Sequence, residues 1–534
     1  MIKEELLEKV RKNNVNLVNK LIKIGKSLSL ENDIKKIFNI ILNEVMEFTK
    51  ADRGIIYITS PDGKELYYEL VKTVTQNQEM DAETARANWD TIKLFSESGE
   101  LIMKSLATFV FHTGFEAHFD DIYGQDFFQI DLTREMDNKT GYHSHSMVAI
   151  PLVDHEEKVL GIIELTNSID DKGSIVAFTE EHIDVLLSVA SQAAITLSNK
   201  LLINNLEKMI FDFTQAIALA IDMKSVDSYK HVQNVASLTN ILAKEINSVD
   251  YGSYAKTRFS SDELEEIAIS GWLHDLGKIA TSERLLNKNT KLLANYDRIH
   301  VLDLRFELLQ QVIENLLQLN NPLEDINTLK NIITILPAYK EFLLNVNNGS
   351  EFLTDEQIVT LQKIAAVKVT HKDKTYYLLD DNELENLLIR RGTLTPAEYS
   401  TIQEHASLTF QILSNINFPQ KYKNVPRIAS MHHERLNGKG YPQGLSEDQI
   451  PLQSRILAIA DVFDALMSKR SYKNGYGLQK SLTILANMAK NNELDKDLLD
   501  ILINNGVYQK FAEFYDGKDV EQTDIETIRK IYRN

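Results

Sequence analysis

The chain has 534 residues, of which 43% are hydrophobic and 25% charged, a globular composition in a chain too long for one ordinary core. Its net charge of −19 argues against a protein that binds duplex nucleic acid through a basic face. Cysteine is absent, which excludes disulfides, thiolate metal sites and cysteine nucleophiles. We therefore expect two or three domains in a cytoplasmic protein without a signal peptide.

The first part of the chain predicts a helix at residues 1–29 and an α+β domain at residues 30–200. Apolar residues at helical spacing precede residue 50, and helical spacing returns from Thr179. Between them, four strands are expected at residues 54–60, 66–71, 146–153 and 159–167, with a turn at residues 61–63. The polar region up to about residue 145 gives no clear pattern.

This order of segments resembles the GAF family of sensor domains. The resemblance rests on Ala51-Asp52-Arg53-Gly54, on the runs GYHSHSMVAIPL and VLGIIELTN, and on the closing helix. It implies an antiparallel sheet flanked by helices, with a pocket for a small molecule on one side of the sheet. We therefore expect a small-molecule ligand or a purely dimerising role for this domain, and the absence of cysteine excludes a thioether-linked bilin.

Residues 195–222 are predicted to form a helical connector between the two halves of the chain. Apolar residues there are spaced alternately four and three apart, as in a coiled-coil seam. The seam consists of Ile195, Asn199, Leu202, Leu206, Met209, Phe213, Ala216 and Ala220. Two interpretations remain open, a single amphipathic helix that lies on its own domain and a parallel two-helix connector that makes a homodimer. No membrane span is expected, because polar and charged residues interrupt the apolar stretch at 183–203.

Histidine and aspartate recur in a fixed order through the predominantly helical residues 210–534. The series consists of His231, His274-Asp275 in HDLGK, His405, His432-His433 in MHHERLNGKGYPQGL, and Asp461. Imidazole and carboxylate ligands without sulfur suit iron, manganese or zinc. A carboxylate such as Asp275 can bridge two ions about 3.5–4 Å apart. A lone histidine is more often a surface or hydrogen-bonded residue, so the ordered series carries the prediction.

The segments HDLGK, HHERLNGKGYP and DVFDALMSKRSYK resemble the HD-GYP family, a branch of the HD phosphohydrolase superfamily. The resemblance covers residues 210–287 and 390–534 and implies an all-α domain that hydrolyses cyclic di-GMP to linear pGpG and often on to GMP. The metal ligands that it implies are His231, His274, Asp275, His405, His432, His433 and Asp461. The substrate contacts that it implies are Tyr441, Asp464, Arg470, Lys473 and Lys278, with Asp275 and Lys278 as catalytic residues.

Two features depart from the family pattern. Asp227 stands where some members have a glutamate that binds a third metal, so we expect two or three divalent ions, iron first and manganese next. Residues 288–389 form an insert that separates Asp275 from His405. The insert begins with an apolar stripe at helical spacing, which we interpret as packing, and residues 368–379 predict a small hairpin.

Two other functions remain open. One is a non-catalytic receptor for cyclic dinucleotides, which degenerate members of such families can become by losing ligands. The other is a phosphodiesterase for another nucleotide, such as cyclic GMP-AMP. Every ligand that the resemblance implies is present, which favours an enzyme. The sequence does not predict the base preference.

Overall fold

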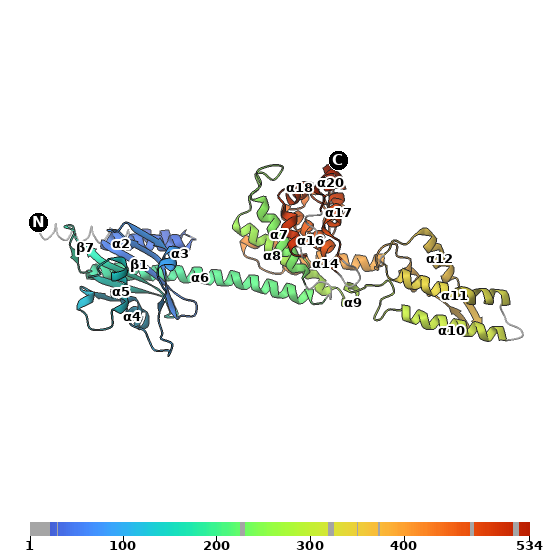
Figure 1. Cartoon of the computed structure of the whole chain (residues 1–534), viewed down its shortest axis with the longest axis horizontal. Helices are drawn as coiled ribbons and strands as arrows, with labels where there is room; N and C mark the ends of the chain where they lie inside the picture. The colour runs from blue at the N-terminus through green and yellow to red at the C-terminus, as the bar shows by residue number, and fades with distance from the viewer. Residues whose placement is uncertain are drawn as a thin grey trace. The chain divides into compact units, whose positions relative to one another are not determined.

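The computed structural model describes residues 22–28, 30–31, 33–224, 230–318, 325–349, 351–371, 374–469, 475–515 and 523–533. The chain divides into two compact units, Met1–Met209 and Ile210–Asn534, whose elements are labelled in Figure 1. Three of the predicted site residues, Asp227, Arg470 and Lys473, lie outside the described residues, as does most of the predicted helix at 1–29.

The first unit is built on an antiparallel sheet with the strand order β3-β2-β1-β7-β6-β5, to which β4 adds beside β2 and β8 beside β7. Its strands are β1 (Ala51–Thr59), β2 (Glu65–Thr73), β3 (Gln78–Asp81), β4 (Ile92–Lys93), β5 (Ala117–Phe119), β6 (Met147–Val153), β7 (Val159–Ile169) and β8 (Ile175–Val176). Its helices are α2 (Ile34–Thr49), α3 (Ala82–Asn88), α4 (Leu106–Thr113), η1 (Ile122–Gly124), α5 (Asp131–Thr140) and the first part of α6 (Glu180–Asp222). The four predicted strands are confirmed as β1, β2, β6 and β7, and the predicted α+β fold with them.

Alternation along the strands sends their side chains into two separate cores. Ile56 and Ile163 pack with α2 and the first part of α6, whereas Ile55, Tyr57 and Ile162 pack with α3 and α4 on the opposite face. The sheet is therefore buried on both faces. This explains why β1 and β7 are more continuously apolar than a strand with one solvated face.

Glu164 on β7 is a buried carboxyl among Tyr57, Arg53 and Asp137. Tyr57 donates to it at 3.2 Å, but burial dominates and raises the pKa of Glu164 from 4.5 to about 7. Because this pKa is higher in the folded than in the unfolded chain, the protonated Glu164 favours folding. This contribution to the free energy of unfolding is fully present below pH 4.5 and is lost as the pH rises through about 7. We expect Glu164→Gln to stabilise this unit by roughly 1–3 kcal/mol at pH 8 and not at pH 4.5.

Amide hydrogen exchange of β7 in the full chain measures this difference, with the exposed Glu100→Gln as the control. Equal protection of the Glu164→Gln variant and the wild type at pH 8 would contradict the prediction.

The second unit is almost wholly helical, as predicted. Its elements are α7 (His231–Ile246), α8 (Ser261–Leu273), η2 (Leu276–Ala280), α9 (Glu283–Leu286), α10 (Ile299–Gln318), α11 (Ile326–Asn347), α12 (Asp355–Ala365), β9 (Lys368–His371), β10 (Lys374–Tyr377), α13 (Asp381–Leu387), α14 (Pro396–Ser414), η3 (Gln420–Tyr422), α15 (Val425–Ser430), η4 (Glu447–Gln449), α16 (Leu452–Met467), α17 (Leu478–Lys490), α18 (Lys496–Asn504), α19 (Val507–Glu513) and α20 (Ile525–Arg533). The main core joins α7 and α16 to α17–α20.

The insert has an apolar core of its own, formed by α10 to α13 and the β9–β10 hairpin. The predicted stripe lies on α10 and is buried there, and the predicted hairpin is also present, so both predictions are confirmed. An apolar core of this kind lets a long insertion fold without drawing on the packing of the rest of the unit.

Helix α6 has 43 residues and spans the division between the two units. Its first part is buried against the sheet through residues such as Leu186, Val189 and Leu197. Farther on, large apolar side chains are exposed at the predicted seam: Ile195 60%, Leu202 49%, Leu206 54%, Met209 47% and Phe213 60%. By length and composition, α6 is the one helix among the described residues that could cross a membrane. Core helices pass the same test, so this is weak evidence.

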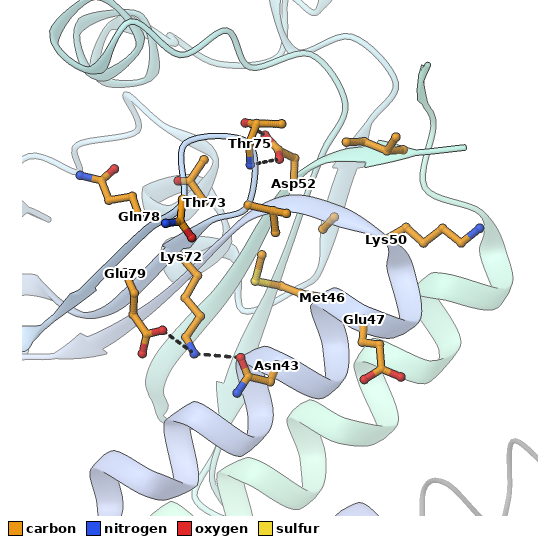
Figure 2. Close-up of a pocket in the computed structure, with 14 residues that line it drawn as sticks. Asn43, Met46, Glu47, Lys50, Asp52, Lys72, Thr73, Thr75, Gln78 and Glu79 are labelled. Carbon is orange, nitrogen blue, oxygen red and sulfur yellow. Dashed lines mark hydrogen bonds and ion pairs between the residues drawn. The ribbon is translucent and has the colours of Figure 1, made fainter. Parts of the chain in front are cut away.

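A surface groove of about 720 Å³ lies between α2 and the turn that joins β2 to β3 (Figure 2). Lys72 Nζ contacts Asn43 Oδ1 at 2.8 Å and Glu79 Oε2 at 3.3 Å. Asp52 accepts from the backbone and the hydroxyl of Thr75. Because these charged groups bind their own neighbours, they do not define a ligand, and we assign none to the groove.

Candidate metal centre

The close crossing of α7 and α8 brings the first two histidines together. A Cβ placed on Gly271 of α8 would lie 3.0 Å from Ala236 Cα on α7. His231 is the first residue of α7, and His274 follows the last residue of α8. The imidazole centroids of the two histidines therefore lie 5.4 Å apart.

The glycine of HDLGK brings the third histidine into reach. The Gly277 N–H donates to Thr409 Oγ1 at 2.9 Å, and the Thr409 hydroxyl donates to the His274 carbonyl at 3.1 Å. A Cβ on Gly277 would lie 2.0 Å from the His405 carbonyl oxygen, so only glycine permits this approach of η2 to α14. As a result, Asp275 Oδ1 lies 3.4 Å from His405 Nε2.

The remaining predicted ligands complete the cluster. His432 and His433 follow α15, and Asp461 lies on α16. The distances are 4.0 Å from His432 Nε2 to Asp275 Oδ1, 3.7 Å from His433 Nδ1 to Asp461 Oδ2, and 3.5 Å from His231 Nε2 to Asp461 Oδ1. The structure thus brings all seven predicted metal ligands together. They form two groups, His231 with His274-Asp275 and His405 with His432-His433. Within each group, the ligand atoms lie within 4.8 Å of one another.

The imidazole rings are oriented with lone pairs that face inward. Nδ1 of His274, His405 and His432 lies 2.8, 2.6 and 2.6 Å, respectively, from a backbone carbonyl three residues earlier. A carbonyl can only accept, so each Nδ1 carries the proton and each Nε2 keeps a free lone pair. These three Nε2 atoms are buried and have no hydrogen-bond partner. An unsatisfied buried group costs about 1–3 kcal/mol, and a divalent ion would satisfy all three. The residues therefore fit a metal centre.

Metal binding needs ionised carboxylates and neutral imidazoles, which suits Asp275, His405, His432 and His433. For His231, burial is outweighed by hydrogen bonds to Asp275 and Asp464, which raise its pKa to about 10, so metal would have to displace a proton there. Burial alone would raise the pKa of Asp275, but Lys278 and the neighbouring histidines hold this pKa well below its usual value. Burial lowers the pKa of His432 and His433 well below the ordinary value, and that of His405 to a lesser extent.

Lys278 and Tyr441 lie at the edge of the cluster. Lys278 Nζ lies 2.5 Å from Asp275 Oδ2 and its side chain is 26% exposed. The Tyr441 ring centroid lies 4.6 Å from that of His433. The loop that carries Tyr441 is held by the buried carboxylate of Glu434, which accepts from the backbone N–H groups of Gln443 and Leu445 at 2.7 and 2.8 Å.

Asp464 lies elsewhere than expected from the sequence. It was expected to contact the substrate, but the structure buries it to 1% exposure behind His231, whose Nδ1 lies 2.7 Å from Asp464 Oδ2. The reason is its place on α16, one turn after Asp461 and facing the interior. Sequence reasoning also missed Asn234, Thr409 and Tyr515, which contact this site only through the fold.

The fold and the site together define a two-part protein, an α+β domain followed by a helical domain with a candidate multinuclear metal centre. Residues 33–197 match the model of the GAF domain, and residues 382–498 match that of the HD domain. The chain therefore belongs to the proteins that combine a GAF domain with an HD domain. The HD match includes His405, His432-His433 and Asp461 but not His231 and His274-Asp275, which precede the insert.

Three similar curated proteins share short matching regions with this chain. A cyclic di-GMP phosphodiesterase of Thermotoga maritima is 42% identical over 97 residues, 18% of this chain and 26% of the relative. The 3'3'-cGAMP-specific phosphodiesterase 3 of Vibrio cholerae is 40% identical over 99 residues, 18% of this chain and 21% of the relative. The cyclic di-GMP phosphodiesterase response regulator RpfG of Xanthomonas campestris is 39% identical over 102 residues, 19% of this chain and 26% of the relative. The matched regions thus span about a quarter of each relative's length.

Proposed function

We propose that this protein is a metal-dependent phosphodiesterase that hydrolyses cyclic di-GMP to linear pGpG and on to GMP. The observation that carries the proposal is the convergence of three unpartnered Nε2 atoms, of His274, His405 and His432, near the ionised Asp275. The names of the similar proteins, which concern cyclic di-GMP or 3'3'-cGAMP, support this substrate class.

Each residue then has a defined task. Divalent ions at this site, iron first and manganese next, would act as Lewis acids toward the phosphodiester and lower the pKa of a bound water. Asp275 would help to hold these ions, because its Oδ2 lies 3.4 Å from His231 and 3.2 Å from His274, while its Oδ1 faces His405. The Lys278 ammonium group lies beside this carboxylate and would stabilise the negative charge that develops on the phosphate during hydrolysis.

Tyr441 lies against His433 and would orient the substrate at the edge of the centre. Arg470 and Lys473, outside the described residues, stay predicted phosphate contacts, and Asp227 stays a predicted third-metal ligand. A small-molecule ligand of the GAF domain and a cytoplasmic location also stay predictions.

A second candidate function is hydrolysis of cyclic GMP-AMP, because one similar protein is named for that substrate.

One experiment tests both candidates and the receptor alternative. Protein purified without oxygen is analysed for metal content and incubated with cyclic di-GMP or 3'3'-cGAMP, with and without a chelator, and the products are separated by chromatography. We expect two or three ions per chain, linear products and complete loss of hydrolysis with the chelator. Metal-loaded protein that binds both dinucleotides but cleaves neither would instead support a receptor.

We also propose that the chain forms a homodimer through α6. The support is the row of exposed apolar side chains at coiled-coil spacing, a pattern that an identical helix can bury. We expect Leu202→Glu/Leu206→Glu to raise the dimer dissociation constant by at least about tenfold, because two seam positions would bury charge. Light scattering after gel filtration measures the mass. Asn204→Glu/Lys208→Glu, on the outer face of the same helix, is the control, and a seam variant that stays as dimeric as this control would sink the proposal.

A further inference from the structure

The Asp464 carboxylate is the centre of a buried hydrogen-bond network that ends on a ligand of the candidate metal centre. Its Oδ2 lies 2.7 Å from His231 Nδ1 and accepts from Ser468 Oγ at 3.1 Å. Its Oδ1 accepts from Asn234 Nδ2 at 2.9 Å and from the Tyr515 hydroxyl. The donors come from α7, from the end of α16 and from the segment after α19, so three separate parts of the chain hold one carboxylate.

The network distinguishes His231 from its neighbours. His274, His405 and His432 are each oriented by a carbonyl of their own helix, at 2.8 Å or less. His231 is the first residue of α7, and its Nδ1 lies 2.7 Å from a side-chain carboxylate, that of Asp464. A side chain from another helix, Asp464 of α16, therefore orients this ring. Nδ1 is then the protonated nitrogen, and Nε2 faces Asp275 Oδ2 at 3.4 Å and Asp461 Oδ1 at 3.5 Å.

We propose that Asp464, Asn234 and Tyr515 are positioning residues that fix the His231 ring so that its Nε2 binds metal. The inference rests on the proposed function only in requiring metal at this centre. Donors on both oxygens prevent the carboxylate from rotating, and Asn234, on the same helix as His231, ties it to that helix. Tyr515 lies beyond residue 498, where the HD-domain match ends, so the C-terminal segment contributes to the centre.

The experiment measures Mn²⁺ affinity of the metal-free full-length protein by titration against a competing chelator. Loss of a group that orients a metal ligand weakens metal binding by about 10- to 100-fold, which we expect for Asp464→Asn. Tyr515→Phe removes one donor and should weaken binding by about three- to tenfold, since Asn234 remains. Tyr532→Phe is the control, because Tyr532, which is buried whereas Tyr515 is half-buried, likewise donates to a carboxylate, that of Asp500, at 2.9 Å.

A positioning role predicts that Tyr515→Phe and Tyr532→Phe lower the melting temperature of the metal-free protein alike, while only Tyr515→Phe weakens Mn²⁺ binding. Unchanged Mn²⁺ affinity in Tyr515→Phe would overturn the inference, and this variant keeps the ring packed on Phe463 even if Asp464→Asn does not fold. The readout is independent of hydrolysis. Protein that binds Mn²⁺ in this pattern but cleaves no dinucleotide would refute the proposed function and leave the inference standing.

Discussion

Replacing His274 and Asp275 together by alanine is expected to abolish hydrolysis of cyclic di-GMP. Asp275 faces both histidine groups at short range, with His231 and His274 near Oδ2 and His405 near Oδ1, at 3.2 to 3.4 Å. Without it and His274, the centre would lose two of its seven predicted ligands, and only Asp461 would still face both groups. The Lewis-acid contribution of the metals is several kcal/mol, so we expect a loss of about 1,000-fold or more in kcat.

Steady-state assays with the dinucleotide, together with metal analysis of the same samples, measure both effects of the double replacement. His300→Ala/Asp448→Ala serves as the control, because it removes the same two residue types from exposed positions of the same unit. Turnover at the wild-type rate in the His274→Ala/Asp275→Ala variant would show that the chemistry lies elsewhere.

The convergence of the predicted metal ligands could be anticipated from the sequence because their order and their flanking residues are local signals. Their orienting partners could not. Asn234 and Asp464 lie 230 positions apart, and Asp464 and Tyr515 lie 51 apart, so neither contact leaves a local pattern. The expectation that Asp464 contacts substrate failed for the same reason, the lack of a local pattern. A family resemblance assigns Asp464 to the site, but only the rotation of α16 decides whether its carboxylate faces substrate or the Nδ1 side of His231.

A similar division holds for the sheet domain. The strands β1, β2, β6 and β7 were predictable, because alternating and continuous apolar runs identify strands that are buried. The elements between residues 74 and 145 were not predicted, since they are short and depend on local caps. Helix α4, for example, has 8 residues and starts at a capping box between Ser105 and Thr108.

The insert explains how ligands far apart in the sequence still meet. At its two ends, the buried Lys288 Nζ lies 2.7 Å from Asn386 Oδ1 and 2.7 Å from Glu398 Oε2, and the Thr393 hydroxyl donates to the Lys288 carbonyl at 2.7 Å. These bonds hold the entry and the exit of the insert together. Helix α14 therefore begins close to Lys288, the residue at which the insert starts, and His405 reaches Asp275 despite the long intervening chain.

Gly277→Ala tests whether this close approach is what assembles the centre. The added Cβ would lie 2.0 Å from the His405 carbonyl and 2.8 Å from Thr409 N, both backbone atoms that cannot move aside without shifting α14. Overpacking of this kind costs about 1–3 kcal/mol. The larger effect concerns the metals, because any shift that relieves the clash moves His405 away from Asp275, which it now approaches to 3.4 Å.

We therefore expect Gly277→Ala to bind fewer ions per chain, to lose about 100-fold in kcat/KM and to unfold at a slightly lower temperature. Gly124→Ala is the control, since the atom nearest to a Cβ there would be Asp121 Oδ2, at 3.4 Å. Metal content measured beside the melting temperature separates two causes. A variant that is destabilised but keeps full metal content and activity would mean that η2 and α14 move together. In that case the close contact at Gly277 would not be what holds His405 near Asp275, and the prediction would be wrong.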